Sequence, residues 1–543
     1  MANNFKKVLD RQMWVQVAPA ANAHAAGVSL ATDLRNDYSR NPFVFQLASA
    51  TVLNRYNAIT KATQIAVNPG LGGTFGAGAG AIFVPSLGLN GAVAAGATTS
   101  SIPTSTVMTA IAPNMFANRG GSGEFGYKIR IIGNTAGGSG KTEERWIVGN
   151  TGGTTPTFIL DTPLTFTPAT GAIYEILAGR VFMLSAGVLA ATTFRSFEIA
   201  SNTLASLSNT NLPATISTDF SSVALDEQYV PYDRKPGEGF VVGTGNYDSS
   251  SVKLCLTATA TGASSISGQA SGGDFGVLTN EYRNFQIRIV EDTGTPTAVG
   301  QRRIIASHTG GTLGSYVTPV YTLGSAWTVQ PSATAKYVIE YPNLLLLWSS
   351  ATAVTYTYNY TNYAINNGTN SIASNAWHVT YFGNRGGVMA AGCTSFASFG
   401  IQPDAGKNAR HSFIYSFRGG AVTLDVLDIA GAATGSWANA SVYDGSYTPL
   451  TTGTCGKYAP ADNEGRFGYL NIYTASTINQ LFRFDVKNRV LQAFTPTDWI
   501  QAGTAAAGDR IVTLVIIDGN DKYTLVYLIA HLSTIAQEIV TQV

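Results

Sequence analysis

Residues 137–142 read GGSGKT and come close to a phosphate-binding loop. Such a loop needs a glycine five positions before the glycine of its Gly-Lys pair, and a helix after it, so that backbone N–H groups surround the phosphates. Thr135 stands where that glycine is required, and residues 143–150 alternate like a strand. The segment therefore predicts a hairpin turn, and we expect no bound nucleotide or other cofactor.

Carboxylate pairs could hydrolyse a glycosidic bond if two of them faced each other at roughly 5–9 Å. Glu143 and Glu144 are adjacent, so a strand would point them to opposite faces. Asp518 and Asp521 flank a Gly-Asn pair, which predicts a hairpin turn and lacks the pattern of a calcium-binding loop. The five histidines and three cysteines have no metal-ligand spacing. We therefore assign no catalytic or metal-binding residue and expect a protein that is not an enzyme.

Tyr356, Tyr358 and Tyr360 recur at every second position and would share one face of a strand. Aromatic rings in such a row can stack on sugars or bases. They can equally fill the contact between two sheets or two subunits. These three tyrosines are the candidate interface or glycan-stacking residues of the chain.

Charge is scarce along the 543 residues: 12% are charged, against roughly 25% in typical soluble proteins, and the net charge is +1. Such a chain has no field that would steer it to nucleic acid or acidic lipid. No apolar run has the length of a membrane helix, so we expect neither specific nucleic-acid binding nor membrane insertion. Because soluble monomers generally use charge to resist association, the composition favours a surface that is buried against neighbouring subunits.

The N-terminal residues MANNFKKVLDRQMW lack the apolar region of a signal peptide. We therefore expect a chain that is made in the cytoplasm of its host cell and is soluble there. Export by a signal peptide is not expected.

Short runs rich in β-branched and aromatic residues, separated by Gly, Asn, Thr and Pro turns, predict an all-β fold. Two segments resemble each other. The first starts at Tyr127 (YKIRII) and the second at Phe285 (FQIRIV), and both continue through a Thr-Gly-Gly-Thr turn to a run ending near a tyrosine. Each copy of this duplication predicts a small antiparallel module of about four strands.

A fainter repeat has the form of a β-hairpin whose partner strand carries an aromatic or Leu, then Asn, Asp or Glu, then an apolar residue. Its copies start at Phe43, Val181, Leu344, Phe413, Tyr469 and, in part, Thr524. Residues 194–213 (FRSFEIASNTLASLSNTNLP) and 480–499 (QLFRFDVKNRVLQAFTPTDW) resemble kelch-type repeats. The resemblance implies a propeller-like body, for which we expect about five or six blades.

A second resemblance is one of style. The segment from Arg145 (RWIVGNTGGTTPTFILDTPLTFTPATGAIYEI) and the Gly/Ala/Thr-rich residues 68–120 are similar to β-rich parts of tailed-bacteriophage virion proteins. It implies a structural component of the virion. Residues 68–120 combine flexibility with low charge, which predicts a long loop or arm that orders against a neighbouring subunit.

The predicted organisation is a propeller with two insertions. An extended N-terminal arm (1–40) precedes a first propeller segment with a Gly/Ala-rich loop (41–117). A first inserted β module (118–178), a propeller segment (179–273), a second homologous module (274–343) and a closing propeller segment (344–543) follow. We expect the ring to close by pairing residues 43–67 with residues 511–540.

The function predicted from these features is that of a kelch-like, non-enzymatic virion structural protein in the tail or neck of a phage, assembled into homo-oligomeric rings. Its expected partners are copies of itself and other virion proteins, and its expected location is the virion. The alternative is a receptor- or glycan-binding tail protein with a host surface glycan as partner. A glycan-active propeller enzyme is less favoured because no facing carboxylates are evident.

Overall fold

The computed structural model describes residues 75, 80–86, 89–117, 126–185, 187–188, 193–216, 220–227, 256–268, 279–310, 317–350, 352–390, 393–398, 413–419 and 423–441, Arg489, and the other strands named below. Within these residues the secondary structure is strand, apart from one short 3-10 helix at Pro296–Ala298. None of the described helical structure is long and apolar enough to cross a membrane. The prediction of an all-β fold is confirmed.

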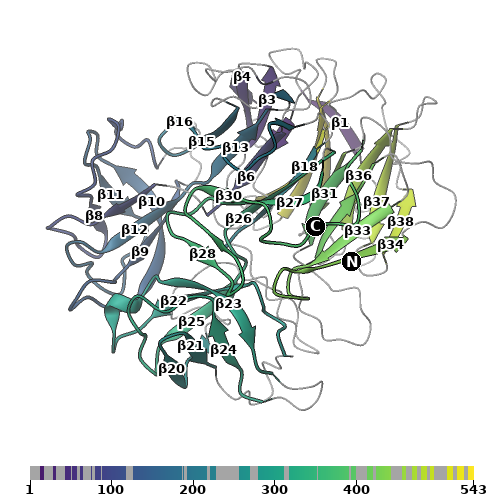
Figure 1. Cartoon of the computed structure of the whole chain (residues 1–543). Coiled ribbons are helices and arrows are strands. Elements are labelled where there is room, and N and C mark those ends of the chain that lie inside the picture. Colours follow the sequence, from purple (N-terminus) through teal and green to yellow (C-terminus); the bar gives the residue numbers. More distant parts are fainter. Residues whose placement is uncertain are drawn as a thin grey trace, which may run out of the picture.

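Six antiparallel sheets of four strands form a propeller body (Figure 1). Blades 1 to 3 contain β2 (Ser29–Ala31), β3 (Phe43–Ser49), β4 (Val52–Asn57) and β5 (Ala62–Gln64); β6 (Gly80–Val84), β13 (Arg180–Leu184), β15 (Phe194–Glu198) and β16 (Thr203–Ser206); and β18 (Phe220–Leu225), β26 (Leu344–Ser349), β27 (Thr352–Asn359) and β30 (Ala376–His378). Blades 4 to 6 contain β31 (Thr394–Ser398), β32 (Phe413–Phe417), β33 (Thr423–Asp428) and β34 (Ser436–Ser441); β35 (Cys455–Ala459), β36 (Phe467–Tyr473), β37 (Asn479–Asp485) and β38 (Val490–Ala493); and β39 (Arg510–Ile517), β40 (Tyr523–Ala530), β41 (Ala536–Gln542) and β1 (Met13–Val17).

The first strands of the blades form the inner circle of the propeller. β2 contacts β6, β6 contacts β18, and the contacts continue through β31, β35 and β39 back to β2. The ring is closed by β1, which pairs antiparallel with β41 and completes blade 6. Two predictions are therefore wrong. Within the predicted arm, the described residues are β1 and β2, and both are blade strands. Within residues 43–67, β3, β4 and β5 belong to blade 1 and do not pair with the strands of residues 511–540.

The hairpin repeat seen in the sequence corresponds to the blades. Its six copies begin in or beside β3, β13, β26, β32, β36 and β40, which are the second strands of the six blades. The last copy looked partial because its outer strand, β1, comes from the other end of the chain. The upper of the two predicted blade numbers is therefore correct.

Each insertion is a small curled sheet. Module 1 (residues 89–177) contains β7 (Asn90–Ala92), β8 (Ser101–Pro103), β9 (Lys128–Ile132), β10 (Thr142–Asn150), β11 (Thr157–Leu160) and β12 (Ile173–Leu177). Module 2 (residues 256–340) contains β19 (Leu256–Thr257), β20 (Ala260–Gly262), β21 (Ser265–Ser267), β22 (Gln286–Glu291), β23 (Arg302–His308), β24 (Val320–Leu323) and β25 (Lys336–Glu340). Two further two-stranded sheets join β14 (Gly187–Val188) to β17 (Thr215–Ile216) and β28 (Ile365–Asn366) to β29 (Ser371–Ile372).

Both modules close by equivalent backbone hydrogen bonds. In module 1 the N–H of Val93 donates to the carbonyl of Ala172 at 2.8 Å, and that of Ala94 donates to Pro103. In module 2 the N–H of Ala258 donates to the carbonyl of Ala335 at 2.8 Å, and the N–H of Thr259 donates to Ser267 in β21, the strand equivalent to β8. One short segment thus bridges the first and last strands, so each module is a small barrel and has more strands than the predicted four or so.

The module boundaries differ from the predicted ones for the same reason. β7 and β8 lie in the Gly/Ala-rich stretch that was assigned to a loop or arm, and β19 to β21 lie before residue 274. The described part of residues 68–120 is therefore an inner blade strand, β6, followed by the start of module 1. The Gly- and Ala-rich composition suggested a loop, but the barrel closes with strands of only three residues in this segment, which such a composition allows.

The interiors of the two barrels use matching positions. Ile129, Ile147 and Tyr174 of module 1 correspond to Ile287, Ile305 and Tyr337 of module 2, and all six side chains are buried. The duplication inferred from the sequence is thus also a duplication of the packed core.

Candidate functional site

The two modules are inserted at the same point of adjacent blades. Module 1 lies between β6 and β13 of blade 2, and module 2 lies between β18 and β26 of blade 3. Neighbouring blades therefore send out equivalent insertions from the same end, and Figure 1 shows them beside each other on one side of the body. Buried arginine and glutamate side chains from both modules and from blade 3 meet at the junction between them.

The GGSGKT segment is part of this junction. It joins β9 to β10 as the predicted hairpin turn. Gly140 in the turn has φ +65°, and its carbonyl accepts a hydrogen bond from the N–H of Asp292 at 2.7 Å. A Cβ at Gly140 would lie 2.3 Å from the backbone oxygen of Asp292, so only glycine fits between the modules. The segment that resembles a phosphate-binding loop is a contact between module 1 and module 2.

Arg130, in the middle of β9, is buried and binds three carboxylates. Its Nε lies 2.9 Å from Glu144 Oε1 on β10, and its Nη1 lies 2.7 Å from both Glu175 Oε2 on β12 and Glu227 Oε1. The first two contacts are cross-strand pairs within module 1. Glu227 follows β18 of blade 3, so the third contact ties module 1 to the propeller.

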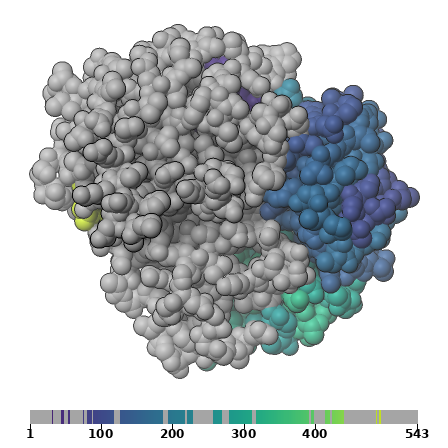
Figure 2. Space-filling view, turned by 180° about the vertical axis from the view of Figure 1, so that it is seen from behind, coloured from purple at the N-terminus to yellow at the C-terminus, as the bar shows by residue number. Residues whose placement is uncertain are grey.

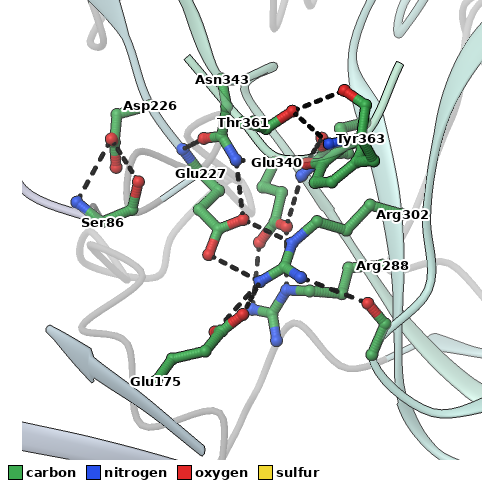
Figure 3. Close-up of polar contacts among 12 residues, drawn as sticks. Ser86, Glu175, Asp226, Glu227, Arg288, Arg302, Glu340, Asn343, Thr361 and Tyr363 are labelled. Carbon is green, nitrogen blue, oxygen red and sulfur yellow. Dashed lines mark hydrogen bonds and ion pairs between the residues drawn. The ribbon is translucent and has the colours of Figure 1, made fainter. Parts of the chain in front are cut away.

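Arg302 of module 2 binds two of the same carboxylates (Figure 3). Its Nε lies 2.6 Å from Glu227 Oε2, and its Nη2 lies 3.0 Å from Glu175 Oε1. Glu227 also accepts a hydrogen bond from the Asn343 side chain at 2.9 Å. One carboxylate group therefore links module 1, module 2 and blade 3.

A further ion pair, between an arginine and a glutamate, joins two strands within module 2. Arg288 binds Glu340 through two parallel hydrogen bonds of 2.9 and 3.1 Å, and both side chains are fully buried. Such planar two-point contacts are the strongest geometry available to an arginine and a carboxylate. We call the set of Arg130, Glu144, Glu175, Glu227, Arg288, Arg302 and Glu340 the junction network.

The junction network holds its linking carboxylates ionised. Burial alone would raise the pKa of Glu227, but the guanidinium groups of Arg302, Arg130 and Arg288 outweigh burial and hold the pKa well below its ordinary value. The pKa of Glu175 is lowered in the same way by Arg302 and Arg130. Glu340 differs, since burial outweighs its arginine partner and raises its pKa. Carboxylates that are held ionised at neutral pH by arginine partners are poor proton donors, so the contacts of Glu175 and Glu227 favour a structural role.

A cavity of about 720 Å³ opens beside the junction network. Its wall comes from four parts of the protein: the ends of blades 2 and 3, module 1 and module 2. Among its lining residues are Ser86, Asn90, Asn134, Glu175, Arg180, Glu227, Thr297, Gln301, Arg302, Asn343, Tyr360, Asn362, Tyr363 and Asn375. The wall is thus built mainly of amides and hydroxyls around a few paired charges.

Tyr356, Tyr358 and Tyr360 lie on one face of β27 and its end, as predicted, but they are buried. The ring of Tyr358 packs against Phe194 of blade 2 at 5.0 Å between ring centres, and against Trp377 of blade 3. These tyrosines fill the contact between two blades. The surface glycan-stacking alternative is wrong for Tyr356 and Tyr358, whereas the edge of Tyr360 reaches the cavity.

The other sequence candidates are engaged in structural contacts. Glu143 bonds Arg145 while Glu144 bonds Arg130, which confirms that they face opposite ways. Asp425, another carboxylate of the chain, is buried between Arg385 and Arg418. Asp518 and Asp521 lie outside the described residues. Among the residues that the structure does describe, no group of three potential metal ligands comes together.

The sequence held one signal of the junction network. Arg130 and Arg288 are the central residues of the two Ile-Arg-Ile motifs of the duplication, and a buried strand does not carry an arginine without partners. Glu227 was missed because it lies outside both repeats and meets Arg130 only in the folded chain.

The strand pairing defines the class of protein: a six-bladed β-propeller that carries two duplicated barrel modules on adjacent blades. No family model matches the chain, and no curated protein does. Among solved structures, Saccharomyces cerevisiae Sqt1 aligns over 98% of this chain and 99% of its own length, at 8% identity and a TM-score of 0.28. A similarity this weak carries no argument, so the class rests on the strands themselves.

Proposed function

We propose that this protein is a non-enzymatic structural component of a tailed-bacteriophage virion, in the tail or neck, where copies assemble into a ring. The observation that carries the proposal is the chemistry of the two module tips, which are uncharged and partly apolar. The phage assignment itself is supported by the resemblance of residues 68–120 and of the segment from Arg145 to virion proteins.

The tip of module 1 comprises residues 105–114 and 148–155. Backbone hydrogen bonds from Met108 to Thr154 and from Ile111 to Gly153 hold the two segments together. Residues 89–117 and 147–160 contain no charged side chain. Val107 is 75% exposed and Val148 is 52% exposed, so the tip offers apolar surface to a neighbour.

The tip of module 2 repeats these properties. Residues 304–335 contain no Asp, Glu, Lys or Arg. Val317 and Val320 are exposed at the end of the barrel that corresponds to the module 1 tip. One subunit therefore presents two similar but non-identical surfaces, which suits a contact between unlike faces that repeats around a ring.

The modules hold these tips away from the body. Asn150 at the end of β10 lies six residues beyond Glu144 in the junction network, which corresponds to about 20 Å along a strand. Figure 2 shows module 1 in blue standing out at the side of the molecule, with module 2 in green below it. Because the junction network fixes the modules, little freedom is lost when the tips bind a second copy.

The proposal is tested by the mass of the purified chain in solution. We expect wild type to form a multimer, and Val148→Glu to shift it towards monomer because a buried charge without a partner opposes the contact. Val388→Glu is the matched control, since Val388 is similarly exposed (48%) but lies outside both tips. A wild-type monomer, or equal dissociation by both variants, would contradict assembly through the tips.

The assignment to a virion needs a separate measurement. We expect mass spectrometry of purified phage particles to find the chain at several copies per particle. Its absence from the particles, with a multimer still present in solution, would contradict the virion location and leave the assembly proposal intact.

A further inference from the structure

We propose that the cavity at the junction of the two modules and blades 2 and 3 binds a neutral saccharide. The site is distinct from the module tips, so it does not depend on the assembly proposed above. Its volume of about 720 Å³ lies within the range of pockets that bind small ligands, roughly 300–1,000 Å³.

The charges in the wall cancel. Glu175 and Glu227 both bind Arg302, and Arg180 binds Glu198 with 2.6 Å between Nε and Oε2. Two cations and two anions line the cavity, and each is held by a partner of opposite sign. A charged ligand would meet no cation or anion in this wall that lacks an ion-pair partner, and it would have to compete with an existing pair. The wall therefore selects against ions and favours a neutral polar molecule.

Polar side chains from three parts of the wall are available to such a molecule. The side chains of Asn90 in module 1, Thr297 in module 2, and Asn362 and Asn375 in blade 3 make no hydrogen bond to another described residue. Amides and hydroxyls donate and accept, which matches the alternating donors and acceptors of sugar hydroxyl groups.

Tyr363 adds a rigid aromatic surface. Its hydroxyl donates to Gln286 at 3.1 Å and accepts from Asn343 at 3.3 Å, so two hydrogen bonds hold the outer end of the ring. The ring is half-buried and lines the cavity. A fixed ring beside amide groups can pack against the apolar face of a sugar while the amides bind its hydroxyls.

The cavity exists only because the module is duplicated. Ile132, Asn134 and Ile173 of module 1 form one side, and Val299, Gln301 and Arg302 of module 2 form another. A propeller with one module would lack one side of the wall. The duplication thus creates a site that neither copy contains alone.

The test uses the full chain and saturation-transfer NMR with matched pairs of sugars. The neutral probes are lactose and N-acetylated chitotriose, and their charged matches are sialyllactose and deacetylated chitotriose. We expect at least one neutral probe to bind, with each charged probe at least tenfold weaker than its neutral match. Absence of binding by all neutral probes, or a preference for the charged form, would overturn the proposal.

The site itself is tested by filling the cavity. Thr297→Trp places a large ring in the cavity from an exposed position, and we expect binding to fall by more than tenfold. Thr322→Trp is the matched control, because Thr322 is an exposed threonine of module 2 that does not line the cavity. Thermal unfolding of both variants checks their folding. Binding that survives Thr297→Trp, or that both variants abolish while they remain folded, would overturn the assignment to this cavity.

Discussion

Arg302 of module 2 occupies the position that Glu144 occupies in module 1. In module 1 the cross-strand partner of Arg130 is Glu144, and in module 2 the partner of Arg288 at the matching position is Arg302. The exchange of an acid for a base gives module 2 the cation that binds Glu175 of module 1. The two copies of the duplication are therefore complementary in charge where they meet.

The first prediction concerns this complementarity. We expect Arg302→Glu to destabilise the protein by about 3–5 kcal/mol, because Glu175 and Glu227 lose a buried partner and gain a like charge. Combining it with Glu175→Arg should recover part of the loss. A double-mutant cycle by chemical unfolding measures this coupling.

The matched control is Lys336→Met, which removes a more exposed ion pair with Glu291 and should cost less than about 1 kcal/mol. Additive effects of the two charge exchanges, with no recovery, would contradict a direct interaction between the modules.

Glu227 should make the stability of the folded chain depend on pH in the acidic range. The pKa of Glu227 is well below its ordinary value of 4.5, so the unfolded chain binds this proton more readily than the folded chain. The stabilisation by Glu227 is therefore fully present above pH 4.5 and is lost as the pH falls towards the folded pKa. We expect the melting temperature of wild type to fall as the pH is lowered below 4.5. Glu227→Gln should melt lower at pH 7 and depend less on pH; parallel pH profiles would contradict this role.

The third prediction separates two buried tyrosines. The Tyr358 hydroxyl is buried without a hydrogen-bond partner among the described residues, whereas that of Tyr360 lies 2.6 Å from the Leu225 carbonyl and 2.9 Å from Asp226 Oδ2. We expect Tyr358→Phe to leave stability unchanged or raise it by about 1 kcal/mol, and Tyr360→Phe to lower it by about 1.5–3 kcal/mol. If the two variants lost equal stability in thermal or chemical unfolding, the difference in hydrogen bonding between the two hydroxyls would be contradicted.

The fourth prediction compares two glycines of one turn. Gly137 and Gly140 both have positive φ, of +73° and +65°, so alanine strains the backbone at either position. A Cβ at Gly137 meets nothing within 4 Å, whereas one at Gly140 meets the Asp292 backbone. We expect Gly140→Ala to cost about 1–3 kcal/mol more than Gly137→Ala. Equal unfolding free energies for the two variants would argue against close packing of this turn on module 2.

The repeated elements of this fold could be predicted from the sequence. The hairpins that start at Phe43, Leu344 and Tyr469 have local patterns, and the Ile-Arg-Ile duplication marks both modules. Strands made by distant partners could not be predicted. β1 and β2 are short and gain their strand structure from the blades they join, and β7 and β8 are strands only because the barrel closes on them.

In the candidate site, too, local patterns indicated some residues and long-range contacts determined the others. The tyrosine row was correctly placed on one strand face, but its burial depends on Phe194 of blade 2, which no local pattern indicates. The cavity depends on four separate parts of the chain, so composition alone could not reveal it. Arg130 was visible in a repeated motif, whereas Glu227 is defined only by folding.

The most direct test of the account is electron microscopy of the purified chain. We expect closed rings in which each propeller touches the next through the valine-bearing ends of its two barrels. Isolated single propellers at micromolar concentration, or rings joined through the blade faces with both barrel ends in solvent, would contradict it.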